Sequence, residues 1–162
     1  MNGSVSSPAQ DLQIAVPLVA ALLDPFDHPP RLFHEIYTSL PDDLRHRARA
    51  ALAVLIAVVI DNPADPKAID EARELARYAD TPEMEYSCAI GVRYGRLRRV
   101  ASSVEHLDRL AGVNVRRDGA ERIALALARC ASAALARRAY RENVTDEEIL
   151  QEIALRAEAD SA

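Results

Sequence analysis

A carboxylate and an imidazole stand one helical turn apart in the stretch Asp43-Leu-Arg-His46. They could form half of a metal site or an acid–base pair, because both groups bind metal ions and transfer protons. Helical di-metal sites use two Glu-x-x-His units and further glutamates, and the chain has no such set. A surface ion pair between positions i and i+3 explains both residues equally well. We therefore expect no metal site and no cofactor.

Glu83, Glu85 and Tyr86 bring two carboxylates and a phenol together, which are groups suited to acid–base catalysis. Glu83 is better explained by its place in the first turn of a helix, where the helix dipole favours negative charge. The sequence shows no Ser-His-Asp order and no glycine-rich phosphate loop. It therefore favours a non-enzymatic protein, with a small helical enzyme or ligand-binding protein as the third interpretation.

The two cysteines, Cys88 and Cys130, lie in apolar stretches of two predicted helices. No group of Cys and His has the spacing of a metal site. We interpret both as buried free thiols in a reducing compartment, because a buried thiol packs like a small apolar side chain. A disulfide between the two helices is the alternative.

Gly91-Val-Arg-Tyr-Gly95 places small residues four positions apart, and Cys88 extends the same narrow face by one turn. Such a face lets two helix backbones approach closely. A neighbouring helix of the same chain is enough to explain it, and we favour that interpretation. Self-association through Cys88, Gly91 and Gly95 is the alternative.

Charge is distributed unevenly along the chain. Residues 93–141 contain 12 arginines and 4 acidic residues, a net charge of +8, whereas 1–92 carry −7 and 142–162 carry −6. The basic segment could bind nucleic acid through its phosphates. The candidate contacts are Arg93, Arg96, Arg99, Arg116 and Arg117, with Arg98 beside them.

Two other interpretations compete with nucleic-acid binding for these arginines. The acidic last helix or the acidic first half could fold back against them, or they could be solvated, and we favour this pair of explanations. An acidic protein partner is the third possibility. The whole chain has a net charge of −5, and among aromatic residues only Tyr94 lies between the arginines, which weakens the case for nucleic acid.

The elements that position these residues are predicted to be helices. The most apolar run, 50–60, contains five β-branched residues and could be a buried strand. A helix is favoured because the apolar positions continue upstream at helical spacing and no other stretch resembles a partner strand. As a helix the run spans roughly 16 Å, too short for a bilayer. We expect a buried central helix at about 41–61.

The predicted helix caps are Ser7 and the capping-box spacings Asp118–Glu121 and Thr145–Glu148, and Gly112 is a predicted helix stop. Together with the apolar stripes, these signals predict six further helices. They cover about 8–23, 31–39, 65–78, 82–111, 118–140 and 145–158. Pro17 predicts a kink or break in the first helix, and 113–117 should form a loop. We expect a single all-α domain over 8–158, a bundle of about seven helices around the central one, with a flexible tail at 1–7 and a frayed C-terminus at 159–162.

The function expected from these features is binding. We expect a non-enzymatic protein–protein interaction module, such as a regulator, adaptor or small assembly component, that forms homo-oligomers because acidic and basic segments can pair between chains. Its docking surfaces would be the basic segment and the apolar stripe of Ile149, Leu150 and Ile153. A nucleic-acid-binding regulator is the alternative, and no membrane partner is expected.

Cellular location can also be weighed from the sequence. No basic residue precedes the apolar stretch 14–23, whereas a signal peptide begins with a basic region. A cytoplasmic protein is therefore expected. The 19 arginines against the single Lys67 indicate a GC-rich bacterial genome.

Overall fold

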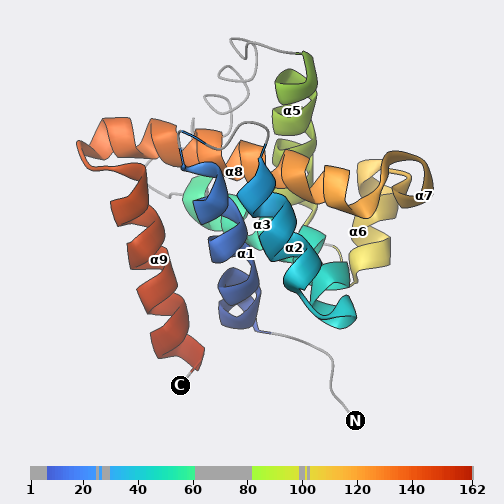
Figure 1. The fold of residues 1–162 in the computed structure, drawn as a ribbon, viewed down its shortest axis with the longest axis horizontal. Coiled ribbons are helices and arrows are strands. Elements are labelled where there is room, and N and C mark those ends of the chain that lie inside the picture. The colour runs from blue at the N-terminus through green and yellow to red at the C-terminus, as the bar shows by residue number, and fades with distance from the viewer. Residues whose placement is uncertain are drawn as a thin grey trace.

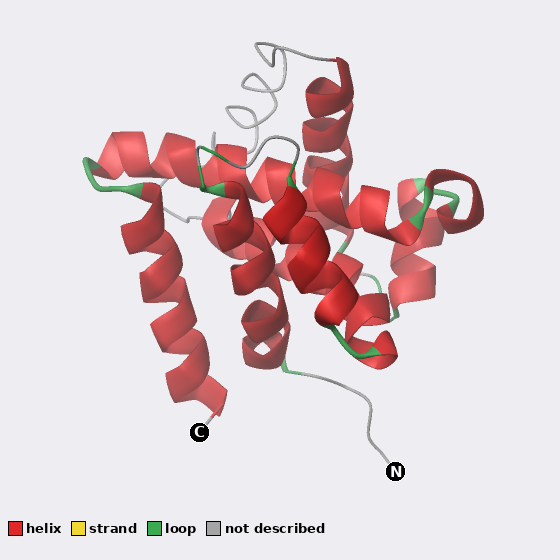
Figure 2. Cartoon of the chain, viewed as in Figure 1, coloured by secondary structure: helices red, strands yellow, loops and turns green. Residues whose placement is uncertain are grey.

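The described part of the chain is built of helices and short loops. The computed structural model describes residues 7–24, 26, 30–60, 82–98, 101 and 103–161, with the backbone alone at 83–85. The predicted helix at 65–78, residues 1–6 of the predicted tail, and Arg99 lie outside the described residues. Within these ranges there are eight helices and no strand (Figures 1 and 2), which confirms the predicted all-α bundle.

The helices follow one another in the order shown in Figure 1. They are α1 (Pro8–Leu22), α2 (Arg31–Ser39), α3 (Asp42–Ile60), α5 (Pro82–Leu97), α6 (Val104–Ala111), α7 (Val115–Asp118), α8 (Ala120–Glu142) and α9 (Asp146–Ser161).

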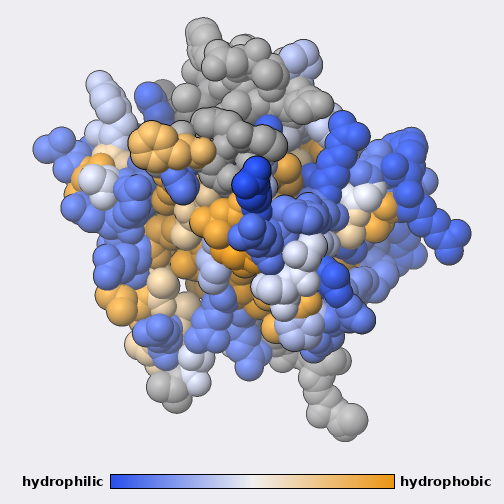
Figure 3. All heavy atoms as spheres, viewed as in Figure 1, coloured by the Kyte–Doolittle hydropathy of each residue, from blue (hydrophilic) through white to orange (hydrophobic). Residues whose placement is uncertain are grey.

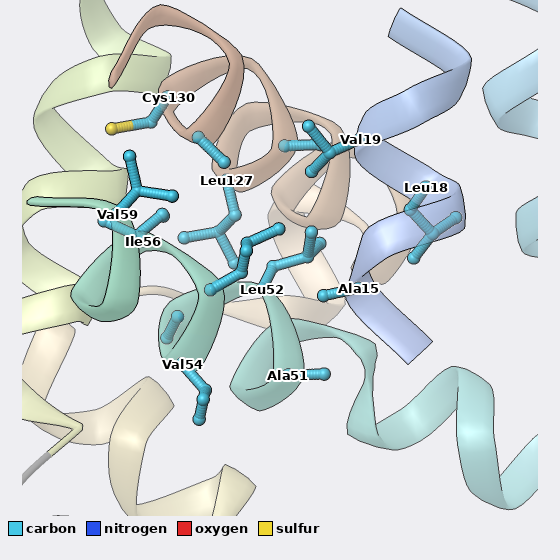
Figure 4. Close-up of a cluster of buried hydrophobic side chains, with 14 of the residues drawn as sticks. Ala15, Leu18, Val19, Ala51, Leu52, Val54, Ile56, Val59, Leu127 and Cys130 are labelled. Carbon is cyan, nitrogen blue, oxygen red and sulfur yellow. The ribbon is translucent and has the colours of Figure 1, made fainter. Parts of the chain in front are cut away.

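Helix α3 is the buried centre predicted from the apolar run. Every residue from 48 to 56 is buried, and α3 packs against α1, α5, α6 and α8. Figure 4 shows its side chains meeting those of α1 and α8, with Leu52 and Leu127 near the middle of the cluster. Because each fully buried Val, Leu or Ile contributes about 1.5–3 kcal/mol, this helix supplies a large share of the apolar core.

Helix α8 is the longest described helix, and it crosses the molecule from α7 to α9 (Figure 1). It packs against α1, α3 and α5 along its length. Helix α9 follows the C-terminal end of α8 and lies against α1 and α8. The short helix α7 and the acidic helix α9 are consequently held at opposite ends of α8.

Two predicted caps are present in the structure. Ser7 and Gln10 exchange side-chain and backbone hydrogen bonds at the start of α1. Thr145 and Glu148 do the same at the start of α9, with donor–acceptor distances of 3.2 and 3.3 Å. Helix α1 continues through Pro17 without breaking in two.

The structure corrects the predicted long helix at 82–111. Helix α5 ends at Leu97, and α6 begins after Ser103, whose hydroxyl accepts a hydrogen bond from the backbone of His106. The apolar periodicity continued across this junction, but a serine cap offers the backbone a new helix start. Gly112, with φ of 73°, ends α6 as predicted.

The region between α6 and α8 also differs from the prediction. Residues 113–117 were expected to form a loop, but Asn114 caps the four-residue helix α7 by accepting hydrogen bonds from the backbones of Arg116 and Arg117. The predicted cap by Asp118 is absent, because Gly119, with φ of 86°, separates the two helices and α8 starts at Ala120.

Candidate functional site

Arginine side chains gather at one end of the molecule, which we call the arginine end. It comprises α6, α7, the C-terminal half of α5 and the N-terminal half of α8. Its basic residues are Arg93, Arg96, Arg109, Arg116, Arg117 and Arg122, all exposed, and the half-buried Arg129. Hydrophilic residues cover this end on the face seen in Figure 3. Because these helices pack on one another, segments separated in sequence contribute to one basic region.

Three of the four acidic residues of the basic segment, Glu105, Asp108 and Glu121, pair with side chains outside it. Glu105 lies 2.7 Å from His46, and Glu121 lies 2.7 Å from His34. A backbone hydrogen bond and the His46 contact hold the pKa of Glu105 below its usual range. His46 thus pairs with Glu105 and not with Asp43, so the predicted pairing on the helix surface is corrected. These contacts use carboxylates from the basic segment and leave its arginines in excess.

Most arginines of the arginine end have no carboxylate partner among the described residues. Arg117 is an exception, because it contacts Asp118 at 3.1 Å and holds the pKa of that carboxyl below its usual range. Arg93 donates to the backbone carbonyl of Leu110 at 3.2 Å. Outside this set, Arg98 lies 3.7 Å from the buried Asp11. The acidic first half therefore neutralises little of the described arginine end.

A buried ionic network fixes the helices beneath the arginine end. Asp108 accepts hydrogen bonds from Arg49 Nε at 3.1 Å, from Arg49 Nη2 at 2.9 Å and from the Tyr94 hydroxyl at 2.8 Å. Burial and the bond to Asp108 raise the pKa of Tyr94 well above its usual range. The network joins α3, α5 and α6. It was missed in the sequence, where the only signal was an arginine on the inner face of an apolar helix.

The narrow face of α5 is covered by the same chain. A Cβ added at Gly91 would lie 2.2 Å from Cys130 Cβ, and one added at Gly95 would lie 3.0 Å from Ile56 Cγ2. Cys88 is also buried. Close packing of α5 on α8 and α3 therefore occupies the three residues, and their face is not available for self-association.

We expect Gly91→Ala to lower the free energy of unfolding by about 1–3 kcal/mol. The new methyl group would overlap Cβ and Sγ of Cys130 in a closely packed core. The loss should appear despite the higher helix propensity of alanine. Thermal unfolding followed by circular dichroism measures it. Gly95→Ala is the matched control and should cost less, since its methyl meets only the Ile56 side chain tightly. A rise in Tm for Gly91→Ala would contradict this packing.

The predicted docking stripe of the last helix is part of the core. Ile149, Leu150 and Ile153 are all buried, because α9 lies against α1 and α8. Ser161 at the end of α9 accepts a hydrogen bond from Gln13 at 3.0 Å. The stripe is therefore corrected from an exposed docking surface to an internal contact. The side of α9 that faces solvent is acidic, with Leu155 58% exposed among carboxylates.

A pocket of about 260 Å³ opens between α5 and α8 at the arginine end. Its apolar lining comes from Ile90, Ile123, Leu125 and Ala126, and its polar lining from Tyr86, Ser87, Asp118, Arg122 and Arg129. The only carboxylate among the described lining residues is Asp118, which contacts Arg117 and also feels the positive charge of Arg122, so the two pocket arginines are in excess over it. An apolar floor with two basic side chains suits an apolar group flanked by negative charge.

No protein-family model, curated protein or solved structure matches this chain. Among the described residues, no three or more His, Cys, Asp or Glu side chains are grouped so that they could hold a metal ion. In the same part of the chain, every helix is too short or too polar to cross a bilayer. The two carboxylates of the predicted Glu83–Tyr86 group lie outside the described side chains.

Proposed function

We propose that this protein is a non-enzymatic interaction module that self-associates head to tail. The arginine end of one copy would receive the acidic helix α9 of another copy. The observation that carries the proposal is the separation of these two charged regions within one molecule. Interactions between copies can neutralise both regions, in line with the electrostatic complementarity of protein interfaces.

The length of α8 supports pairing between molecules. Its 23 residues separate α7 from α9 by roughly 34 Å, at about 1.5 Å per residue. Charges in solution are screened over about 8–10 Å at physiological salt. The two regions therefore interact weakly within a copy. Between copies they are free to meet.

The solvent-facing side of α9 also complements the pocket in polarity. Leu155 is exposed there, within a shallow groove lined by Glu148, Gln151, Glu152, Arg156 and Ala159. The pocket offers an apolar floor and the side chains of Arg122 and Arg129. An apolar anchor flanked by two glutamates, Glu148 and Glu152, would thus meet an apolar recess that carries two arginines, as in the core and rim of a typical interface. Because the two surfaces differ, the contact is heterologous and generates rings or filaments.

We expect light scattering at low ionic strength to give a mass that rises with concentration above the 17.8 kDa of one chain and falls on addition of salt. Reversing the pocket charges (Arg122→Glu with Arg129→Glu) or the helix charges (Glu152→Arg with Glu158→Arg) should give monomers. Mixing the two double variants should restore association. Glu35→Arg, an exposed reversal on α2, is the control and should associate like the parent protein. A parent protein that stays monomeric at every salt concentration would refute the proposal.

The alternative of nucleic-acid binding rests on the same exposed arginines. It would give a salt-sensitive mobility shift of DNA or RNA. Arg96→Glu with Arg116→Glu should abolish this shift and leave the pocket arginines in place. We also propose a cytoplasmic setting, since both cysteines are free thiols and the cytosol keeps thiols reduced. The proposed bacterial origin rests on the 19 arginines against one lysine, and the proposed regulatory or assembly role rests on self-association.

A further inference from the structure

Cys88 of α5 and Cys130 of α8 lie together in the core. Both are free thiols, each about 1% exposed, and Cys130 packs on the face of α5 that carries Cys88, against Gly91 one turn further along the helix. Figure 4 shows the Cys130 sulfur pointing toward the pale green ribbon of α5. The sequence places them 42 positions apart, so only the packing of α5 on α8 brings them into contact.

Gly91 explains how the two helices come close enough for this contact. Cys130 Cβ and Sγ lie 2.2 and 2.5 Å from the point where a Cβ of residue 91 would stand. Any larger residue would push α8 away from α5. A disulfide needs its two Cβ atoms within about 4.5 Å, which only closely packed helices provide.

The surroundings of the two thiols differ in ways that assign their roles. The hydrogen bond with Cys130, with help from the positive charge of Arg129, lowers the pKa of Cys88. The same hydrogen bond and burial raise the pKa of Cys130. Cys88 is therefore the better nucleophile, because the thiolate is the reactive form.

A small oxidant has a route toward this pair. The pocket between α5 and α8 is lined by Ser87 and Arg129, the residues that precede Cys88 and Cys130 in the chain. Its volume is about 260 Å³, and a water molecule takes up about 30 Å³, so the pocket has room for a small oxidant. Solvent therefore reaches the immediate sequence neighbours of both thiols.

We propose that Cys88 and Cys130 are a modification site at which a small peroxide forms an intramolecular disulfide. The Cys88 sulfur attacks a peroxide oxygen, the O–O bond breaks, and Cys88 becomes a sulfenic acid as one water leaves. The Cys130 sulfur then attacks the Cys88 sulfur, the S–O bond breaks, and a second water leaves. The two thiols supply two protons and two electrons, and hydrogen peroxide is reduced to two waters. A thiol reductant reverses the bond.

The test treats the folded, reduced full-length chain with hydrogen peroxide, then unfolds and alkylates it for mass spectrometry. We expect loss of both alkylation sites, a mass lower by two hydrogen atoms, and recovery with dithiothreitol. The bond closes a loop of 43 residues (positions 88 to 130), so the oxidised protein should melt roughly 10 °C higher.

Two variants assign the individual sulfurs. Cys130→Ala should retain a peroxide-dependent sulfenic acid on Cys88, detected with a dimedone probe, because the second sulfur is missing. Cys88→Ala should give no such product. If both thiols of the folded parent protein are still alkylated after peroxide treatment, or if only disulfides between chains form, the proposal is wrong.

Discussion

Leu55→Asp is expected to unfold the protein. Leu55 is fully buried in α3, the helix surrounded by α1, α5, α6 and α8. The substitution removes an apolar side chain worth about 2–5 kcal/mol and places a carboxyl group in a site with no partner, which costs several kcal/mol more. The sum of the two costs approaches the free energy of unfolding of a typical domain, about 5–15 kcal/mol. Circular dichroism should show loss of helix and of a cooperative thermal transition.

Val58→Asp is the matched control for this prediction. Position 58 lies in the same helix, but its side chain is 39% exposed, so a carboxylate there stays in contact with water. This variant should remain soluble and helical with a modest fall in Tm. A soluble Leu55→Asp protein that unfolds cooperatively would show that α3 is not the centre of the core.

The second large effect is expected from Asp108→Ala. The substitution leaves the buried Arg49 guanidinium without its carboxylate and the Tyr94 hydroxyl without its acceptor. Breaking a buried ion pair by removing one partner costs about 3–5 kcal/mol, because a buried charge is left uncompensated. Urea denaturation should show this loss as a lower midpoint. Asp42→Ala breaks an exposed ion pair with Arg45, outside the proposed self-association surfaces, and is the control, with an expected cost below about 1 kcal/mol.

Replacing all three polar members of this network tests whether the loss of stability in Asp108→Ala comes from the uncompensated charge or from lost packing. The triple variant Arg49→Met, Tyr94→Phe and Asp108→Leu leaves neither a buried charge nor an unpaired hydroxyl. It should recover most of the stability lost in Asp108→Ala, as apolar replacements of buried ion pairs do. If the triple variant is as unstable as Asp108→Ala, the loss arises from packing and not from the uncompensated arginine.

Several features of the fold could be predicted because their causes are local. The apolar run at 50–60 gave the central helix, since its phase matched the upstream residues and a strand would have lacked partners. Ser7 with Pro8 after it, and the capping pair Thr145–Glu148, marked two helix starts because a helix cap acts within one turn. The structure added Gln10 as the partner of Ser7. The break before α6 was missed because apolar spacing continued across residues 98–103 while the Ser103 cap outweighed it.

The candidate sites depended on contacts that the sequence pattern does not contain. A stripe such as Ile149, Leu150 and Ile153 has the same spacing whether it faces its own core or a partner. Burial in the structure decided between them. Likewise Gly91 indicated close packing, but only the placement of α8 identified Cys130 as the neighbour.

The sequence by itself determined the all-helical class, the buried centre and the unequal charges of the segments, because composition and local periodicity specify these properties. Only the tertiary structure decided which charges are compensated. Arg49 and Asp108 are 59 positions apart, and His34 and Glu121 are 87 apart. Such pairs form where packing places them. That placement occupies the acids of the basic segment, leaves most of the described arginines at the arginine end without carboxylate partners, and sets α9 at the opposite end of α8.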